Sequence, residues 1–207
     1  TPQEGLSTRG VSSPNEPRWL RLLCLSLVLC VASPLGGRYV SLGVIMSSHT
    51  TVIVDWRGPF SYEEIESNPD WENGLYLATG KLKYEREATI QYCGITEGTF
   101  IGRLKNHHKV HEINRDKEFW IGEVKYPDEV SRYFLEMAES IIIYFWQPEL
   151  NERKKLSLPK PITLINRWYK KDYSPRYRQH PMCKYLDDVL SWDGELWRSG
   201  NLQVWED

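Results

Sequence analysis

The pattern of apolar and polar positions divides the chain from Thr50 onward into short strands and a few helices. β-branched residues over 50–55 favour a strand, and apolar runs over 74–79 and 89–96 favour two more strands. A polar connection between the second and third of these predicts an antiparallel hairpin. The segment 118–126, which ends at Pro127, has the same strand-like composition.

Helical periodicity and end signals predict three helices. Ser61 followed by Glu64 is a capping-box pattern, so a short helix is expected over 62–66. Segment 100–113 has apolar residues at helical offsets, and Asp128 can cap a helix over 129–145 that ends before Pro148. The order of these elements predicts an α+β fold, a small three-stranded antiparallel sheet flanked by helices.

The chain changes character after Asn151 and becomes basic and aromatic. A strand is expected over 159–168, and Asp193-Gly194 predicts a hairpin turn between strands at 185–192 and 195–197. We therefore expect a β-rich basic C-terminal extension over 156–207. Its basic residues lie among tryptophans and tyrosines, a mixture that suits phosphate contact with base stacking. A solvated edge strand whose aromatic residues pack on the domain is the alternative.

The first 45 residues differ from everything that follows. Residues 1–17 are rich in Gly, Ser, Pro and Thr and are expected to be disordered. A basic start, a short apolar run over 22–32 and a small-residue end are similar to a secretory signal peptide, and the run is too short to span a bilayer. The alternative is that the leader before Met46 is not native coding sequence. We expect a cytoplasmic or nucleoid protein, with secretion left open by the signal-like segment.

Composition narrows the classes of protein to consider. The 207 residues carry a formal net charge of −2, so a nucleic-acid-binding surface would have to be local. The four cysteines, Cys24, Cys30, Cys93 and Cys183, do not have the spacing of a zinc site, and they suit a reducing compartment.

Two polar positions in the expected helices point to phosphate chemistry. Arg103 and His107 are four residues apart, so on one helix they would share a face and could approach one phosphate. Glu139 falls among apolar residues of the later helix, and a carboxylate placed there needs a partner. The partner could be a divalent cation such as Mg²⁺, or an arginine or backbone donors.

These residues belong to an ordered series that resembles the GIY-YIG nuclease superfamily. Gly74-Leu75-Tyr76 stands for its first motif and Tyr92-Cys93-Gly94 for its second, followed by the Arg103, His107, Glu139 and Asn151 positions. The resemblance places a nuclease domain at 46–155.

The resemblance implies a metal-dependent endonuclease that hydrolyses phosphodiester bonds in DNA, with RNA not excluded. Its cofactor would be Mg²⁺ or another divalent cation at Glu139, with Arg103 on the phosphate and Asn151 as a positioning residue. Tyr76, Tyr92 and His107 would lie near the attacking water, and the sequence leaves open which of them takes the proton.

The expected partner is DNA and not a membrane, and the oligomeric state is undetermined. Candidate DNA-binding residues are the basic side chains near the motifs and in the extension: Lys105, Arg153, Lys154, Lys155, Lys170, Lys171, Arg176 and Arg178. The alternative function is a nucleic-acid-binding or protein-interaction module that keeps the fold without catalysis.

Overall fold

The computed structural model describes residues 49–202, except 129–130, 177–179, 181–182 and 184–185. The leader predicted for residues 1–45 and the candidate DNA-binding residue Arg178 lie outside the described residues. The described residues belong to one compact unit.

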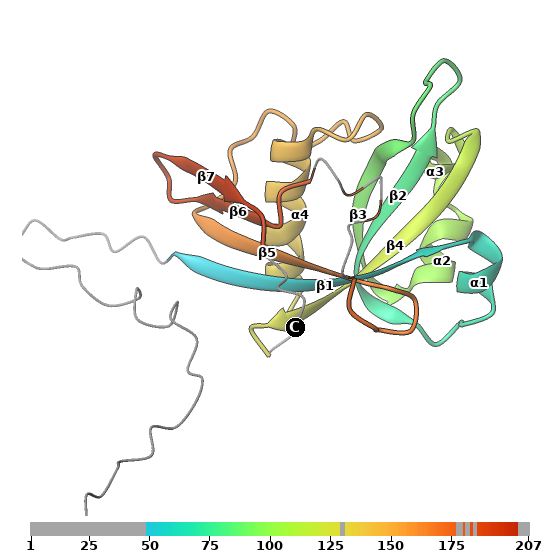
Figure 1. The fold of residues 1–207 in the computed structure, drawn as a ribbon, viewed down its shortest axis with the longest axis horizontal. Coiled ribbons are helices and arrows are strands. Elements are labelled where there is room, and N and C mark those ends of the chain that lie inside the picture. The colour runs from blue at the N-terminus through green and yellow to red at the C-terminus, as the bar shows by residue number, and fades with distance from the viewer. Residues whose placement is uncertain (1–48, 129–130, 177–179, 181–182, 184–185, 203–207) are drawn as a thin grey trace, which may run out of the picture. The chain divides into compact units, whose positions relative to one another are not determined.

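Seven strands of the described residues form one mixed sheet (Figure 1). They are β1 (Thr50–Phe60), β2 (Glu72–Lys81), β3 (Thr89–Thr99), β4 (Arg115–Tyr126), β5 (Ile162–Tyr169), β6 (Val189–Trp192) and β7 (Trp197–Gly200). Their order across the sheet is β3-β2-β4-β1-β5-β6-β7. The pairing of β1 with β5 is parallel, and the other neighbouring strands run antiparallel.

The predicted small three-stranded antiparallel sheet is therefore wrong. Strands β3, β2 and β4 are antiparallel neighbours, but β4 also pairs with β1, and the sheet continues through β5 to β7. The C-terminal segment supplies strands of this same sheet. It was misjudged because its contact with β1 joins residues more than a hundred positions apart, as in the pair Thr50 and Ile162.

Side chains fix β5 against β1 at the centre of the sheet. The Trp56 indole Nε1 donates to Asn166 Oδ1 at 2.8 Å, and both residues are buried. One position away on each strand, Arg167 donates to both carboxylate oxygens of Asp55, at 2.6 and 2.9 Å. These polar contacts satisfy groups that burial would otherwise leave unpaired.

The helices are α1 (Tyr62–Glu66), α2 (Phe100–Lys105), α3 (His108–His111) and α4 (Arg132–Trp146). The capping box before α1 is confirmed, with both reciprocal bonds between Ser61 and Glu64 present. Helix α4 starts later than predicted, with Ser131 as its N-cap in place of Asp128. Within the described residues no helix is long and apolar enough to cross a membrane.

The prediction of a single helix over 100–113 is wrong, because the helix is interrupted at Asn106 and His107. Asn106 ends α2, and His107 has an extended backbone, with φ −91° and ψ 92°, at the start of α3. Arg103 and His107 therefore belong to different elements.

The sheet has a hydrophobic core on each face. Leu135, Ile141 and Ile142 of α4 pack in one core, and the short helices α1, α2 and α3 contribute to the other. Strand β3 is at the edge of the sheet and contacts α4 as well as α2 and α3. Helices of both faces therefore flank this edge (Figure 1).

Candidate active site

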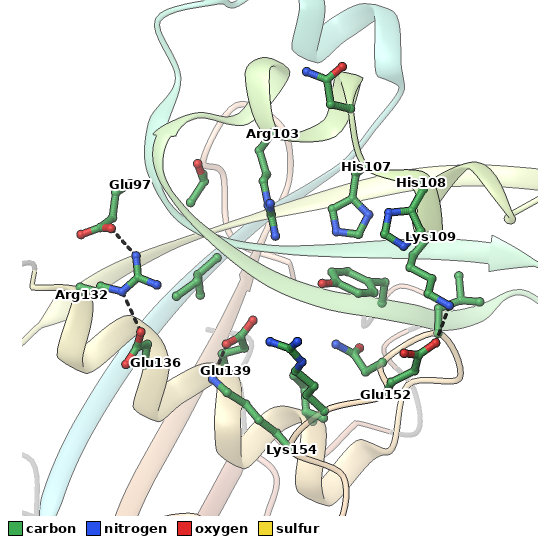
Figure 2. Close-up of a pocket in the computed structure, with 18 residues that line it drawn as sticks. Glu97, Arg103, His107, His108, Lys109, Arg132, Glu136, Glu139, Glu152 and Lys154 are labelled. Carbon is green, nitrogen blue, oxygen red and sulfur yellow. Dashed lines mark hydrogen bonds and ion pairs between the residues drawn. The ribbon is translucent and has the colours of Figure 1, made fainter.

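A cleft of about 750 Å³ lies at the β3 edge, where the helices of the two faces meet. Its walls come from β3, α2, α3, α4 and the segment after α4 (Figure 2). The predicted catalytic residues that border it are Tyr92, Arg103, His107, Glu139 and Asn151. Positions up to 59 residues apart in the sequence are thus brought to one solvent-accessible space.

Tyr76, the remaining predicted catalytic residue, is packed behind the cleft. Its side chain is fully buried, and its hydroxyl makes no hydrogen bond of standard geometry with a described residue, although Arg103 lies close enough to interact with it. Its ring stacks on Tyr92 with centroids 6.0 Å apart. Burial raises the pKa of Tyr76, and Arg103 opposes this rise without reversing it. Tyr76 therefore remains protonated at neutral pH.

Gly94 allows the two tyrosines to pack this closely. A Cβ atom at position 94 would lie 2.6 Å from the Tyr76 hydroxyl oxygen and 2.8 Å from Cε1 of Tyr92. Both distances are too short for van der Waals contact, so the third residue of the second motif has a steric reason to be glycine.

His107 lies edge-on to Tyr92, with ring centroids 4.5 Å apart. Burial, followed by the positive charge of Arg103, lowers the pKa of His107 to about 4. The imidazole is therefore neutral at pH 7. Its Nδ1 atom is buried and has no hydrogen-bond partner among the described residues.

Arg103 projects from α2 into the cleft, toward the wall that carries Glu139 (Figure 2). Its side chain is exposed, and it makes no ion pair with an acidic residue in the part of the chain that the structure describes. A guanidinium in this position can offer two parallel donors to a phosphate group.

Glu139 faces Arg103 from α4, and Lys154 is its partner. Lys154 Nζ lies 2.5 Å from Glu139 Oε2, and the Glu139 side chain is only 13% exposed. Lys154 has a left-handed backbone conformation, with φ 69°, which is uncommon for a residue with a side chain. The sequence suggested an arginine or backbone donors as partners of Glu139, but the partner is a lysine. Lys154 is 15 residues away, so no local sequence pattern connects it with Glu139.

The donor set fits a hydrated Mg²⁺ ion held by one carboxylate. Among the described residues, no three His, Cys, Asp or Glu side chains gather as a metal-binding group. Mg²⁺ commonly keeps several waters and takes one or two carboxylates, and Glu139 borders a space large enough for those waters. The ammonium of Lys154 would have to move from Glu139 for this carboxylate to bind a metal ion.

Asn151 is a structural brace between the segment after α4 and the edge strand. Its side-chain Oδ1 accepts from the Cys93 N–H at 2.9 Å, and its Nδ2 donates to the Cys93 carbonyl at 2.9 Å. The Leu150 N–H donates to the Gln91 carbonyl at 2.8 Å. These bonds hold the following residues, Arg153 and Lys154, beside Tyr92.

Ion pairs join the two walls at both ends of the cleft (Figure 2). Arg132 of α4 bridges Glu97 of β3 and Glu136 of its own helix. At the other end Lys109 Nζ lies 2.6 Å from Glu152 Oε1. Arg132 and Glu136 have the i,i+4 spacing of a helical ion pair, whereas the contacts with Glu97 and Glu152 join residues far apart in the sequence and have no local pattern.

The described basic residues proposed for DNA binding do not all border the cleft. Arg153 and Lys154 border the cleft, whereas Lys105, Lys155 and Lys170 do not. Lys171 pairs with Glu64 of α1, at 2.5 Å. Arg176 donates to the carbonyls of Tyr169 and Gly58 and lies over the Trp120 ring.

Comparison with protein-family models, with curated proteins and with solved structures found no match to this chain.

Proposed function

We propose that this chain is a metal-dependent endonuclease that hydrolyses phosphodiester bonds in DNA, as its resemblance to the GIY-YIG superfamily implies. The observation that carries the proposal is the gathering of Tyr92, Arg103, His107 and Glu139 around one cleft. An arginine, a neutral histidine and a carboxylate are the groups that binding a phosphodiester and activating water require.

Arg103 is the proposed phosphate ligand. Its guanidinium is exposed in the cleft and would donate to two oxygens of the scissile phosphate, which would then lie between α2 and α4. Arg153 borders the same space and can bind a neighbouring phosphate of the DNA backbone.

His107 is the proposed general base. Its low pKa keeps the imidazole neutral at pH 7 and so able to accept a proton, although it also makes His107 a weaker base than an ordinary histidine. A tyrosine of ordinary pKa must first lose its own proton, which costs roughly 4 kcal/mol at pH 7. Burial raises the pKa values of Tyr76 and Tyr92, which makes that cost larger. The water oxygen would bond to phosphorus as its proton passes to His107. The bond from phosphorus to the leaving oxygen would break, and that oxygen would take up a proton from solvent.

The other residues orient these groups. Tyr92 contacts the His107 ring and remains a hydrogen-bond donor because its hydroxyl stays protonated. Asn151 holds the cleft wall to β3. When bound at Glu139, a divalent cation would stabilise the negative charge that develops on the leaving oxygen.

Binding of DNA without cleavage is the second candidate function. The observation that favours it is the ion pair of Glu139 with Lys154, because it already neutralises the carboxylate that a metal ion would need. In this case Arg103, Arg153 and Lys154 would bind the phosphate backbone and no bond would break.

Plasmid nicking distinguishes the two functions. The full chain is incubated with supercoiled DNA with and without Mg²⁺, beside the Glu139→Gln variant. Glu66→Gln is the matched control, because Glu66 is an exposed carboxylate on α1 outside the cleft. We expect Mg²⁺-dependent nicking by the unchanged chain and by Glu66→Gln, and a loss of roughly 100-fold or more in Glu139→Gln, a typical effect of removing a key electrostatic group.

Equal nicking by Glu139→Gln and the unchanged chain would contradict the proposed role of Glu139. DNA binding without nicking in any divalent cation would establish the second function.

A further inference from the structure

The Lys154 side chain can act in two ways, as a phosphate ligand and as the ion-pair partner of Glu139. Lys154 borders the cleft as a cation that can bind phosphate, and it also occupies the carboxylate proposed to bind metal. The Lys154 side chain is 32% exposed, so it is accessible from the cleft while it holds Glu139.

The surrounding chain holds Lys154 in this position. Before Lys154 in the chain, Asn151 is hydrogen-bonded to Cys93. After it, the Lys155 carbonyl accepts a hydrogen bond from the Gln147 side chain at 3.0 Å. The left-handed backbone at Lys154 lies between these two attachments. A sparsely populated backbone conformation held from both sides is typical of a functional position.

We propose that Lys154 competes with the metal ion for Glu139 and yields it when a DNA phosphate enters the cleft. An ammonium 2.5 Å from Oε2 and a divalent cation cannot share that oxygen, because like charges repel at this distance. A phosphate supplies Lys154 with an alternative anion and lowers the cost of leaving Glu139. This inference rests on the proposed function.

Coupling of this kind is reciprocal. If DNA tightens metal binding by releasing Lys154, the metal ion tightens DNA binding by the same factor. Without DNA the carboxylate remains neutralised by Lys154, so the free protein holds metal weakly. Lys154 is thus a positioning residue that links metal loading to the presence of substrate.

The test measures Mn²⁺ binding directly, by titration calorimetry on the full chain with and without a short phosphorothioate DNA duplex. We compare the unchanged chain with Lys154→Met, Lys154→Gln and Glu139→Gln. Lys125→Met is the matched control, because Lys125 forms an ion pair with Glu123 at 2.5 Å outside the cleft. Circular dichroism confirms that each variant is folded.

Without DNA, we expect both Lys154 variants to bind Mn²⁺ roughly fivefold to tenfold more tightly than the unchanged chain, the factor that loss of one partly buried ion pair corresponds to. DNA should tighten Mn²⁺ binding by a similar factor in the unchanged chain and in Lys125→Met, and have little effect in the Lys154 variants.

Two results would overturn the inference in different ways. Mn²⁺ binding that depends on Glu139 but is equal with and without Lys154 would show that the lysine does not compete, and the proposed function would stand. Absence of any Glu139-dependent Mn²⁺ binding, in every variant and with DNA, would remove the metal site and the proposed hydrolysis together.

Discussion

At the residue scale, burial separates three aromatic side chains that the sequence left equivalent as proton acceptors. Tyr76 is fully buried and does not border the cleft. Tyr92 and His107 both border it, Tyr92 with a raised pKa and His107 as a neutral imidazole. The low pKa of His107 also affects the free energy of unfolding, because the unfolded chain binds a proton at His107 more readily than the folded chain does.

The pH dependence of unfolding tests the environment of His107. Its folded pKa of about 4 lies below the ordinary value of 6.5, so the stabilisation is complete above pH 6.5 and is lost as the pH falls toward 4. Allowing for partial solvent contact, we expect urea unfolding to show an extra loss on the order of 1–2 kcal/mol between pH 7 and pH 4.5 in the unchanged chain relative to His107→Asn. Parallel pH profiles for the two chains would show that His107 titrates normally.

The sequence named seven of the 18 residues that line the cleft, but not their contacts. The motif series named Arg103, His107 and Glu139, which border one cleft even though the expected shared helix of Arg103 and His107 is broken at Asn106. The partner of Glu139 could not be predicted, because it depends on a left-handed backbone at Lys154 that brings the chain back to α4.

At the element scale, the edge strand β3 organises the cleft. It carries Tyr92, contacts helices on both faces, and accepts the segment after α4 along its outer side. The short helix α1 was predicted well because its capping box is a local sequence signal. The position of His107 was not, because the extended backbone between α2 and α3 has no clear sequence pattern.

Replacing Asn151 should loosen this edge. Asn151→Ala removes both bonds to Cys93 and leaves a buried N–H and carbonyl unpaired, so we expect a loss of about 1–3 kcal/mol in the free energy of unfolding. Hydrogen exchange should accelerate at the Cys93 amide. The control is Asn68→Ala, which removes a hydrogen bond from the Asn68 side chain to the Glu64 carbonyl and does not involve β3. Unchanged exchange at Cys93 in Asn151→Ala would show that the brace is not what protects the strand.

At the scale of the whole molecule, the C-terminal strands are part of the sheet that supports the cleft. Ile162, Leu164 and Leu190 are fully buried in the same core as α4. The sequence could not show this, because parallel pairing of β1 with β5 depends on contacts across most of the chain and not on a local turn.

A chain that ends at Lys155 tests this dependence. It would lack β5, β6 and β7 and would expose the backbone edge of β1 together with part of the α4 core. We expect no cooperative unfolding transition in urea, as followed by circular dichroism, because loss of several buried apolar side chains at about 2–5 kcal/mol each exceeds typical domain stability. A cooperative transition close to that of the full chain would show that residues 49–155 fold without the C-terminal strands.

The bonds that Leu150 and Asn151 make to β3 also bear on how the protein behaves at high concentration. An uncovered edge strand presents free N–H and carbonyl groups that can pair with a strand of another molecule, which is a common route to aggregation. In this chain, the backbone at Gln91 and Cys93 is already engaged by the segment after α4. The segment that supplies Arg153 and Lys154 to the cleft thus also occupies part of the edge to which a strand of another molecule could pair.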